Sequence, residues 1–356
     1  MEQKSVLIGM SGGVDSSVAA ALLKEQGYHV IGATMRLWTY SDSCNMKHEG
    51  CCAESAVEDA RRVCDKLGID FYVMNFKDMF KDKVVDYFVD EYIHGRTPNP
   101  CIACNKYLKF DALLKKALAM GIDYVATGHY AKIEKGADGK YILRASEAVK
   151  KDQSYVLYNF TQEQLAHTLM PLGGYNKDWV RQKAEELGLG VAHKPDSQEI
   201  CFVEDDDYAK FITDYSGYKP KEGDILDVNG NVIGKHRGLI YYTIGQRKGI
   251  GAYGRPMFVM KIDAENNTIT LGEKGMEFSN ELTAYDVNFV SGEFPKENML
   301  ITAKVRYQAP PAAAMLCPQK DGTVKLMFPE PQRAVTPGQA VVLYDGEYVL
   351  GGGTVL

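Results

Sequence analysis

The sequence lacks the features that would place the chain in a specialised class of protein. It has no run of about 18 apolar residues, so no membrane-spanning helix is expected. No internal repeat or low-complexity segment is evident. The first strand is expected within about five residues of the N-terminus, which leaves no room for a signal peptide. These absences predict a globular protein of the cytoplasm.

Charge and composition set few further limits. The net charge is −6, and the 45% hydrophobic and 25% charged residues are ordinary for a globular protein. This negative total neither predicts nor excludes a nucleic-acid partner, because binding depends on local basic patches. With 356 residues, the chain is expected to form two or three domains.

The eight cysteines do not suggest a structural disulfide framework in a chain of this size without a secretion signal. Cys101 and Cys104 form a Cys-x-x-Cys pair, and Cys201 follows about a hundred residues later. This spacing suits reactive thiols that form mixed disulfides, but also a zinc half-site or an iron–sulfur ligand pair. Cys51 and Cys52 are adjacent and form no second pair, and unreactive loop thiols remain the plain alternative.

The most informative stretch is residues 4–17, which read Lys-Ser-Val-Leu-Ile-Gly-Met-Ser-Gly-Gly-Val-Asp-Ser-Ser. An apolar strand over 6–10, a glycine turn and a helix from Val14 are predicted. This order aims backbone N–H groups and the positive end of the helix dipole at one point, which suits a phosphate. The stretch carries neither a Walker A nor a Gly-x-Gly-x-x-Gly motif, and an ordinary glycine turn is the alternative.

Strand and helix patterns alternate over the first 130 or so residues, which predicts an α/β fold with a doubly wound parallel sheet for residues 1–205. Short β-branched runs between glycine turns then predict a small, mainly β domain for 206–275 and a C-terminal β-barrel for 276–356. Ligands of such a sheet lie at the carboxyl ends of its strands. The polar stretches 38–53 and 94–105 are predicted to be functional loops.

Four groups of polar residues are candidates for chemistry. Asp15 is the one acid of the phosphate loop, and is a candidate Mg²⁺ ligand or simply a helix N-terminal acid. His129, at a predicted strand end, would position phosphate or substrate, or only be hydrogen-bonded in place. Residues 151–155 read as a polar loop, and the pair Arg306 and Tyr307 suits a phosphate and a stacked base.

The Ser-Gly-Gly-x-Asp-Ser-Ser pattern resembles the pyrophosphate loop of the N-type ATP pyrophosphatases, whose fold is adenine nucleotide hydrolase-like (HUP). Nearly the whole chain resembles one family among them, the tRNA-specific 2-thiouridylases, which thiolate the wobble uridine of bacterial tRNA. The stretches that carry this resemblance are residues 9–16, 95–100, 104–106, 126–130, 151–155, 196–202 and 242–247.

The resemblance implies a role for each matching residue. ATP and Mg²⁺ would be held by Gly9, Met10, Ser11, Gly12, Gly13, Val14, Asp15, Ser16, Met35 and Gly128, with Asp15 as the candidate metal ligand. The target uridine would contact Asn99, Pro100 and Cys101, and the rest of the tRNA would contact His129, Lys151, Asp152, Gln153, Arg306, Tyr307 and Gln339. Cys201 would carry a persulfide received from a sulfur-relay protein or a cysteine desulfurase, and Cys104 would free that sulfur by forming a disulfide with Cys201.

The implied reaction is chemically coherent. Adenylation of the uridine C2 oxygen makes AMP the leaving group, and a persulfide then attacks a carbon that would otherwise be a poor electrophile. The adenylate must be kept from water, so the bound tRNA has to cover the site.

One residue departs from the family pattern, since the family often has an acid where this chain has Cys101. That thiol creates a trio, Cys101, Cys104 and Cys201, that could ligate a [4Fe–4S] cluster, so persulfide relay and a cluster both stay open. An ATP-dependent small-molecule ligase would explain the phosphate loop but not the cysteines. A non-catalytic RNA-binding module would leave the loop unexplained.

Overall fold

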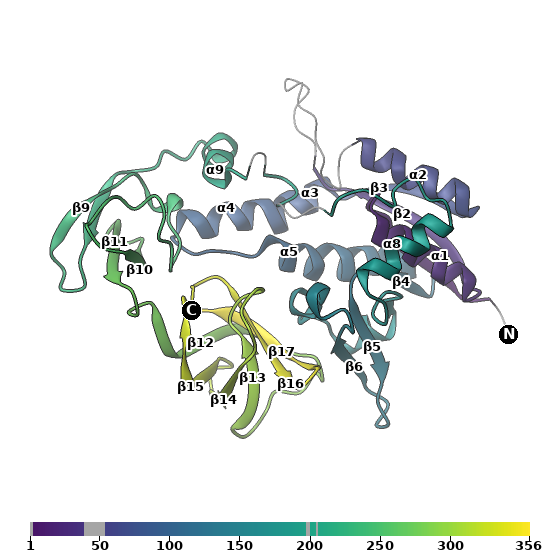
Figure 1. Ribbon diagram of the computed structural model, residues 1–356. Helices are drawn as coiled ribbons and strands as arrows, with labels where there is room; N and C mark the ends of the chain where they lie inside the picture. The colour runs from purple at the N-terminus through teal and green to yellow at the C-terminus, as the bar shows by residue number, and fades with distance from the viewer. Residues whose placement is uncertain (1–2, 39–53, 197–199, 204–205) are drawn as a thin grey trace.

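The computed structural model describes residues 3–38, 54–196, 200–203 and 206–356 (Figure 1). Most of the predicted loop 38–53, with Cys44, Cys51 and Cys52, lies outside the described residues, as do residues 197–199. Within the described ranges, no helix is both long enough and apolar enough to cross a membrane. The chain forms a parallel-sheet domain, a middle β domain and a C-terminal barrel, as expected.

The first domain contains a parallel sheet with the strand order β3-β2-β1-β4-β7. Its strands are β1 (Ser5–Gly9), β2 (His29–Arg36), β3 (Asp70–Asn75), β4 (Tyr124–Ala126) and β7 (Thr168–Leu169). Val6, Leu7 and Ile8 of the central strand are fully buried, because a parallel strand covered on both faces is apolar throughout. The predicted doubly wound sheet is confirmed, and the short edge strand β7 was not foreseen.

Helices cover both faces of this sheet (Figure 1). One core holds Val6 and Ile8 together with helices α1 (Val14–Glu25), α2 (Glu54–Leu67) and α8 (Lys177–Glu186). The other core holds Leu7 and a longer helical run. That run consists of α3 (Lys77–Phe80), η1 (Lys81–Val85), α4 (Asp86–Ile93), α5 (Pro100–Ala103), the π-helical η2 (Cys104–Ala112) and α6 (Leu113–Ala119).

The predicted loop 94–105 is wrong in its second half, because the chain is helical from Pro100 to Ala119. The side-chain oxygen of Asn99 accepts hydrogen bonds from the N–H groups of Cys101 (3.1 Å) and Ile102 (3.3 Å). Asn99 is thus the N-cap, and proline at the first helical position suits the start of a helix. Cys101 and Cys104 therefore lie on a helix and not in a loop.

The middle domain is built around a four-stranded sheet in the order β10-β11-β8-β9. Its elements are α9 (Tyr208–Ser216), β8 (Gly223–Leu226), β9 (Val232–His236), η5 (Leu239–Tyr241), β10 (Met257–Asp263) and β11 (Thr268–Glu273). Ile225, Val259 and Leu271 lie in its separate core.

The C-terminal strands close into a barrel, as predicted, because β12 pairs with both β15 and β17. The strands are β12 (Phe278–Phe289), β13 (Met299–Lys304), β14 (Ala312–Pro318), β15 (Val324–Arg333), β16 (Ala340–Asp345) and β17 (Tyr348–Val355). A hairpin of the first domain, β5 (Ala131–Lys135) and β6 (Tyr141–Ala145), extends this sheet through the pair Arg144 and Tyr348. The segment that follows the hairpin contains the short elements η3 (Val149–Lys151), η4 (Ser154–Leu157) and α7 (Gln162–Ala166).

Hydrogen bonds fix the barrel to the first domain. The Gln339 side-chain amide donates to the Thr97 carbonyl (2.9 Å), and the Thr97 N–H donates to the Pro337 carbonyl (2.9 Å). The buried Tyr155 hydroxyl donates to the Ala340 carbonyl (2.7 Å). These bonds set the position of the barrel relative to the helix that carries Cys101 and Cys104.

Candidate functional site

The phosphate loop is a preformed turn between β1 and α1. The Ser16 hydroxyl donates to the Gly13 carbonyl (3.1 Å) and accepts from the Ser11 N–H (3.2 Å). Gly13 is the N-cap, and no side chain caps the helix. The N–H groups of the first turn of α1 are thus left for an anion, as the sequence predicts.

Two glycines are required by close approaches around this loop. Gly12 has φ +69°, and a Cβ there would lie 2.3 Å from the Ala56 carbonyl oxygen. A Cβ at Gly128 would lie 2.7 Å from the backbone nitrogen of Ser16. Gly128 therefore brings the end of β4 directly against the start of α1.

A cavity of about 240 Å³ opens at this edge of the sheet. The predicted site residues in its wall are Gly9, Met10, Ser11, Asp15, Ser16, Met35, Gly128, His129 and Gln153. Thr127, from the predicted stretch 126–130, is also in the wall, and residues that the sequence did not single out complete it, namely Ala33, Thr34, Leu37 and Lys109. The apolar wall and the loop N–H groups together suit a ligand with a flat ring and an anionic tail.

Two of the predicted tRNA-contact residues, His129 and Gln153, lie in this cavity wall. His129 Nδ1 is 2.7 Å from the Thr127 hydroxyl, and the ring packs beside Phe110. Burial, helped by the nearby Lys109 ammonium, holds the pKa of His129 well below its ordinary value, so the ring is neutral at pH 7. The Gln153 side-chain oxygen accepts from the Tyr130 N–H (3.0 Å), which fixes its amide at the cavity.

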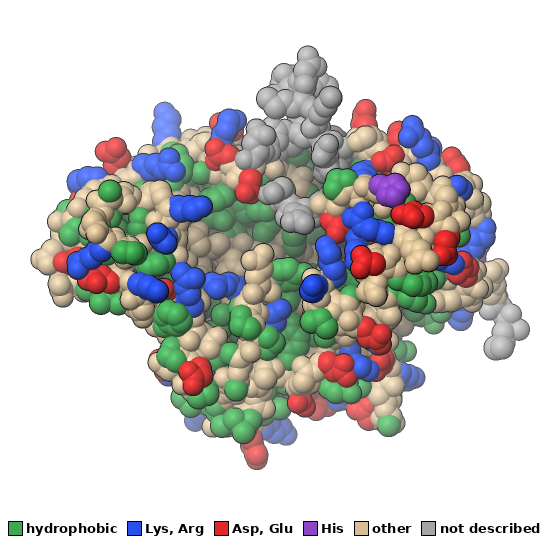
Figure 2. Space-filling model, viewed as in Figure 1, with side chains coloured by type: hydrophobic (Ala, Val, Ile, Leu, Met, Phe, Trp, Pro, Cys, Tyr) green, Lys and Arg blue, Asp and Glu red, His purple; other side chains and the backbone are tan. Residues whose placement is uncertain are grey.

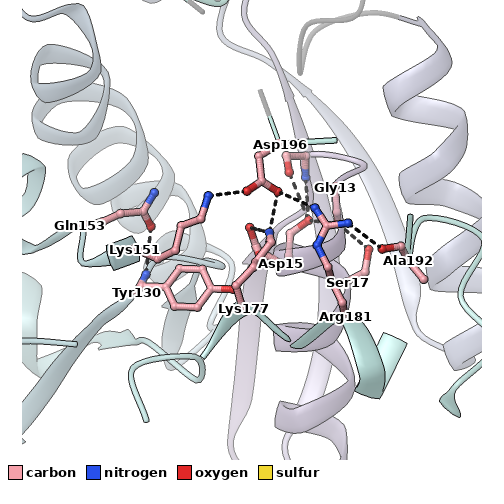
Figure 3. A network of polar contacts seen from close by, with 12 residues as sticks. Gly13, Asp15, Ser17, Tyr130, Lys151, Gln153, Lys177, Arg181, Ala192 and Asp196 are labelled. Atoms are coloured by element: carbon pink, nitrogen blue, oxygen red, sulfur yellow. Dashed lines mark hydrogen bonds and ion pairs between the residues drawn. The ribbon is translucent and has the colours of Figure 1, made fainter. Parts of the chain in front are cut away.

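Asp15 is held by a network that the sequence did not predict (Figure 3). Its carboxylate accepts hydrogen bonds from the Tyr130 hydroxyl (2.7 Å) and from the Lys177 ammonium (2.8 Å to each oxygen). Lys177 also pairs with Asp196 (2.6 Å), which pairs in turn with Lys151 (2.6 Å). Burial opposes ionisation of Asp196, but the two lysines outweigh it and lower its pKa.

The polar cluster 151–155 lies where the barrel meets the first domain. The Asp152 carboxylate accepts from the N–H groups of Ser146 (2.9 Å) and Ser154 (3.3 Å), so it shapes its own turn. The Asp152 carbonyl accepts from the Tyr307 hydroxyl of the barrel (3.1 Å). The pKa of Tyr307 is raised, first by burial, then by Asp152 and, to a smaller extent, by Cys101, so these predicted residues share one electrostatic neighbourhood.

Arg306 is half-buried next to Tyr307 and lies within electrostatic range of the Tyr155 phenol. Lys304, which the sequence did not single out, lies over the rings of Tyr155 (5.8 Å) and Tyr307 (5.7 Å). Gln339 is separate from this group, since its amide is used in the contact with Thr97.

Asn99 and Pro100 lie at the start of α5, away from the phosphate-loop cavity. Asn99 caps α5 and lines a second cavity of about 230 Å³, whose other residues include Lys106, Tyr285 and Ala340. Pro100 is buried, whereas Cys101, one residue further, is exposed. Neither Asn99 nor Cys101 lines the phosphate-loop cavity.

Two of the predicted cysteines differ in exposure. Cys104 is buried at the start of η2, and Cys201 is exposed. Phe202 belongs to the same apolar core as Cys104 and packs against Phe80 and Phe88, so Cys201 lies at the margin of that core. The part of the chain that the structure describes contains no disulfide and no group of three Cys, His, Asp or Glu side chains that could hold a metal ion.

Three family models match the chain. The model described as the tRNA methyl transferase HUP domain matches residues 4–205. The tRNA methyl transferase PRC-barrel domain matches residues 209–273, and the aminomethyltransferase beta-barrel domain matches residues 279–355.

The chain is similar over its full length to curated proteins named tRNA-specific 2-thiouridylase MnmA. It is 58% identical to the protein of Acetivibrio thermocellus, with 100% of both chains covered. It is 57% identical to that of Clostridioides difficile, covering 99% of this chain and 98% of the relative. With Clostridium perfringens the identity is 55%, over 100% and 99%. The chain belongs to the tRNA-specific 2-thiouridylase family.

Proposed function

We propose that the protein is an ATP-dependent tRNA 2-sulfurtransferase that converts the wobble uridine to 2-thiouridine, with AMP and pyrophosphate as the other products. The observation that supports this most directly is the position of the phosphate-loop cavity. His129 and Gln153 lie in its wall, and Lys151 reaches its Asp15 network through Asp196. A nucleotide in this cavity would therefore lie beside the residues expected to touch RNA. Both ATP and tRNA are cytoplasmic, and we propose that compartment.

The adenylation half uses the loop and Asp15. The N–H groups of α1 bind the phosphates, and Met35 and Leu37 pack against the adenine. The Asp15 carboxylate fits a Mg²⁺ site, because Mg²⁺ is usually held by one or two carboxylates together with substrate phosphates. When bound, the ion neutralises phosphate charge. The neutral imidazole of His129 and the amide of Gln153 orient the uridine edge without adding charge.

The sulfur half uses Cys201 and Cys104. The terminal sulfur of a Cys201 persulfide forms a bond to uridine C2, and AMP leaves with the electron pair of the C2–O bond. The Cys104 thiolate then attacks the Cys201 sulfur and breaks its bond to the transferred sulfur, which remains on the tRNA as the thiocarbonyl. A dithiol reductant must reduce the resulting disulfide for the next turnover. The persulfide itself comes from a sulfur-relay protein or a cysteine desulfurase.

The tRNA would dock across the first domain and the barrel. Figure 2 shows Lys and Arg side chains around a hollow on this face, between the middle domain on the left and the phosphate-loop domain on the right. Lys151, Arg306 and Tyr307 are proposed to touch the tRNA, with Lys304 as an added cation. Asn99, Pro100 and Cys101 are proposed to meet the target uridine, Asp152 to shape the docking turn and Gln339 to hold the barrel in place.

The [4Fe–4S] alternative lacks support, since the described residues bring no three suitable ligands together. A single assay tests the proposed function: incubation of the protein with ATP, a persulfide donor and tRNA, followed by mass analysis of the digested nucleosides. Sulfur-for-oxygen exchange in uridine, with AMP formed only when tRNA is present, is expected. A methylated nucleoside, or AMP formation that ignores tRNA, would contradict it.

A further inference from the structure

The Lys177 ammonium occupies an unusual position for a side chain outside the predicted loop. It lies between two carboxylates, 2.8 Å from both oxygens of Asp15 and 2.6 Å from Asp196, and only 12% of its side chain is exposed (Figure 3). Lys177 is the first residue of α8, whose N-cap is Asn176. The helix start thus aims one buried cation at the acid of the phosphate loop.

A polyphosphate cannot enter this loop and leave the ion pair unchanged. The Asp15 carboxylate would repel the phosphates unless a cation lay between them, and a metal ion on its oxygens competes directly with Lys177. A buried lysine that loses one of two carboxylates needs another anion, because an unpaired buried charge is strongly destabilising. The nearest new anion is the phosphate chain of the nucleotide.

The surroundings indicate which phosphates these are. Ala33, Met35 and Leu37 form the apolar side of the cavity, and Lys177 is not among its lining residues. Lys194 is a second cation at the loop, with its ammonium 3.2 Å from the Gly12 carbonyl oxygen and 2.8 Å from Asp59. An adenine against the apolar wall therefore directs the far end of its phosphate chain toward these cations.

We propose that Lys177 binds the β- and γ-phosphates of ATP, exchanging its bond to Asp15 for the nucleotide while Asp196 keeps the ammonium in place. This inference rests on the proposed function. In the reaction, uridine O2 forms a bond to the α-phosphorus, the bond from that phosphorus to the bridging oxygen breaks, and its electron pair goes to pyrophosphate. The uridine loses its N3 proton to water. Lys177 stabilises the negative charge that grows on the leaving pyrophosphate. AMP has no β- and γ-phosphates, so Lys177 should not contribute to AMP binding.

Asp196 is the positioning residue in this arrangement. It holds Lys177 from one oxygen and Lys151 from the other, and Arg181 lies 3.6 Å away. The charge of Asp196 keeps the Lys177 ammonium close to the loop after the ion pair between Lys177 and Asp15 has broken. Because Lys151 is a proposed tRNA contact, the same carboxylate joins the ATP and RNA sides of the site.

The test measures equilibrium binding of ATP and of AMP, each with Mg²⁺, to the full chain. Lys177→Met removes the charge at similar length and is expected to weaken ATP binding at least about tenfold with AMP binding unchanged, and to lower kcat for AMP formation by about 10²-fold or more. Lys183→Met is the matched control, because Lys183 lies on the same helix and pairs with Glu25. Lys177→Arg is expected to restore part of the ATP affinity.

Equal loss of ATP and AMP binding, or no loss of ATP binding, would overturn the inference and leave Lys177 as an anchor of α8. Wild-type protein that bound neither nucleotide would overturn the proposed function as well. If Lys177→Met does not fold, Asp196→Asn decides the matter. It keeps the lysine but loosens its placement, and must weaken ATP binding more than AMP binding.

Discussion

The proposed site has a phosphate side, around the loop at residues 9–16, and a sulfur side, around Cys104 and Cys201. The two sides differ in how far their residues are already held in place for the reaction. On the phosphate side, Ser16, Asp15 and Gln153 are each held by hydrogen bonds or ion pairs at the cavity. On the sulfur side, Cys104 is buried in an apolar core while Cys201 is exposed. The proposed adenylation therefore needs little more than the exchange of the ion pair between Lys177 and Asp15, whereas a disulfide requires Cα atoms about 5–6 Å apart and both thiols accessible. This difference predicts that tRNA binding moves the sulfur side more than the phosphate side.

Replacing Asp15 should give the largest effect, because it removes the proposed Mg²⁺ ligand of the phosphate side. Asp15→Ala is expected to lower tRNA-dependent AMP formation about 10³-fold or more, since one metal supplies several kcal/mol of charge stabilisation. The measurement is release of labelled AMP, and Asp178→Ala, an exposed acid on α8, is the control. Undiminished AMP release would show that the loop does not bind ATP in the proposed way.

Substitutions of Cys201 and Cys104 should show whether adenylation and sulfur transfer are separate steps. Cys201→Ser is expected to abolish thiolation while tRNA-dependent AMP formation continues, because adenylation uses no thiol. Cys104→Ser should still load a persulfide on Cys201 but fail to release its sulfur, which intact-mass analysis would detect as a protein that retains the added sulfur. Full turnover by Cys104→Ser would refute the relay, and loss of AMP formation in Cys201→Ser would mean that the two steps are not separate.

Arg306 tests whether the barrel carries RNA. Arg306→Ala is expected to weaken tRNA binding several-fold and to reduce the slope of log affinity against log salt by about one, as for one lost phosphate contact. Binding should be titrated at several salt concentrations. Lys320→Ala is the control, because that lysine is exposed in the turn between β14 and β15. An unchanged slope would place Arg306 outside the interface.

Substitution of Cys101 distinguishes persulfide relay from a [4Fe–4S] mechanism, and under the relay its effect on thiolation is expected to be smaller than those above. Under persulfide relay, Cys101→Ser is expected to slow thiolation only a few-fold and to leave persulfide loading unchanged, because an exposed hydroxyl replaces an exposed thiol. Under a cluster mechanism the same change would bleach an anaerobically purified brown protein and stop the reaction. An absorbance spectrum and an iron assay of both proteins distinguish these results.

Features formed by consecutive residues could be predicted from the sequence, whereas contacts between residues far apart in the chain could not. The phosphate loop was predictable because its strand, turn and helix are consecutive, and the start of α5 was readable in principle from Asn99 and Pro100. Lys177 was missed because its partner Asp15 lies 162 residues away, and nothing local marks such a pair. The extension of the barrel by β6 depends likewise on Tyr348. The burial of Cys104 follows from packing around η2, which no cysteine spacing encodes.

His129 offers the smallest effect and tests how dry the phosphate side is. The folded protein holds the pKa of His129 well below about 6.5, the value expected when unfolded, so the unfolded chain binds more protons below that pH. Stability from this site is therefore present above about pH 6.5 and is lost as the pH falls toward the folded pKa. His129→Asn should make the acid side of the stability profile shallower by up to about 1.4 kcal/mol per pH unit. Unfolding midpoints between neutral and acidic pH measure this, with His167→Asn as the control outside the cavity. A mutant profile parallel to that of the wild type would mean that His129 has the same pKa in the folded protein as in the unfolded chain, which would contradict a dry cavity.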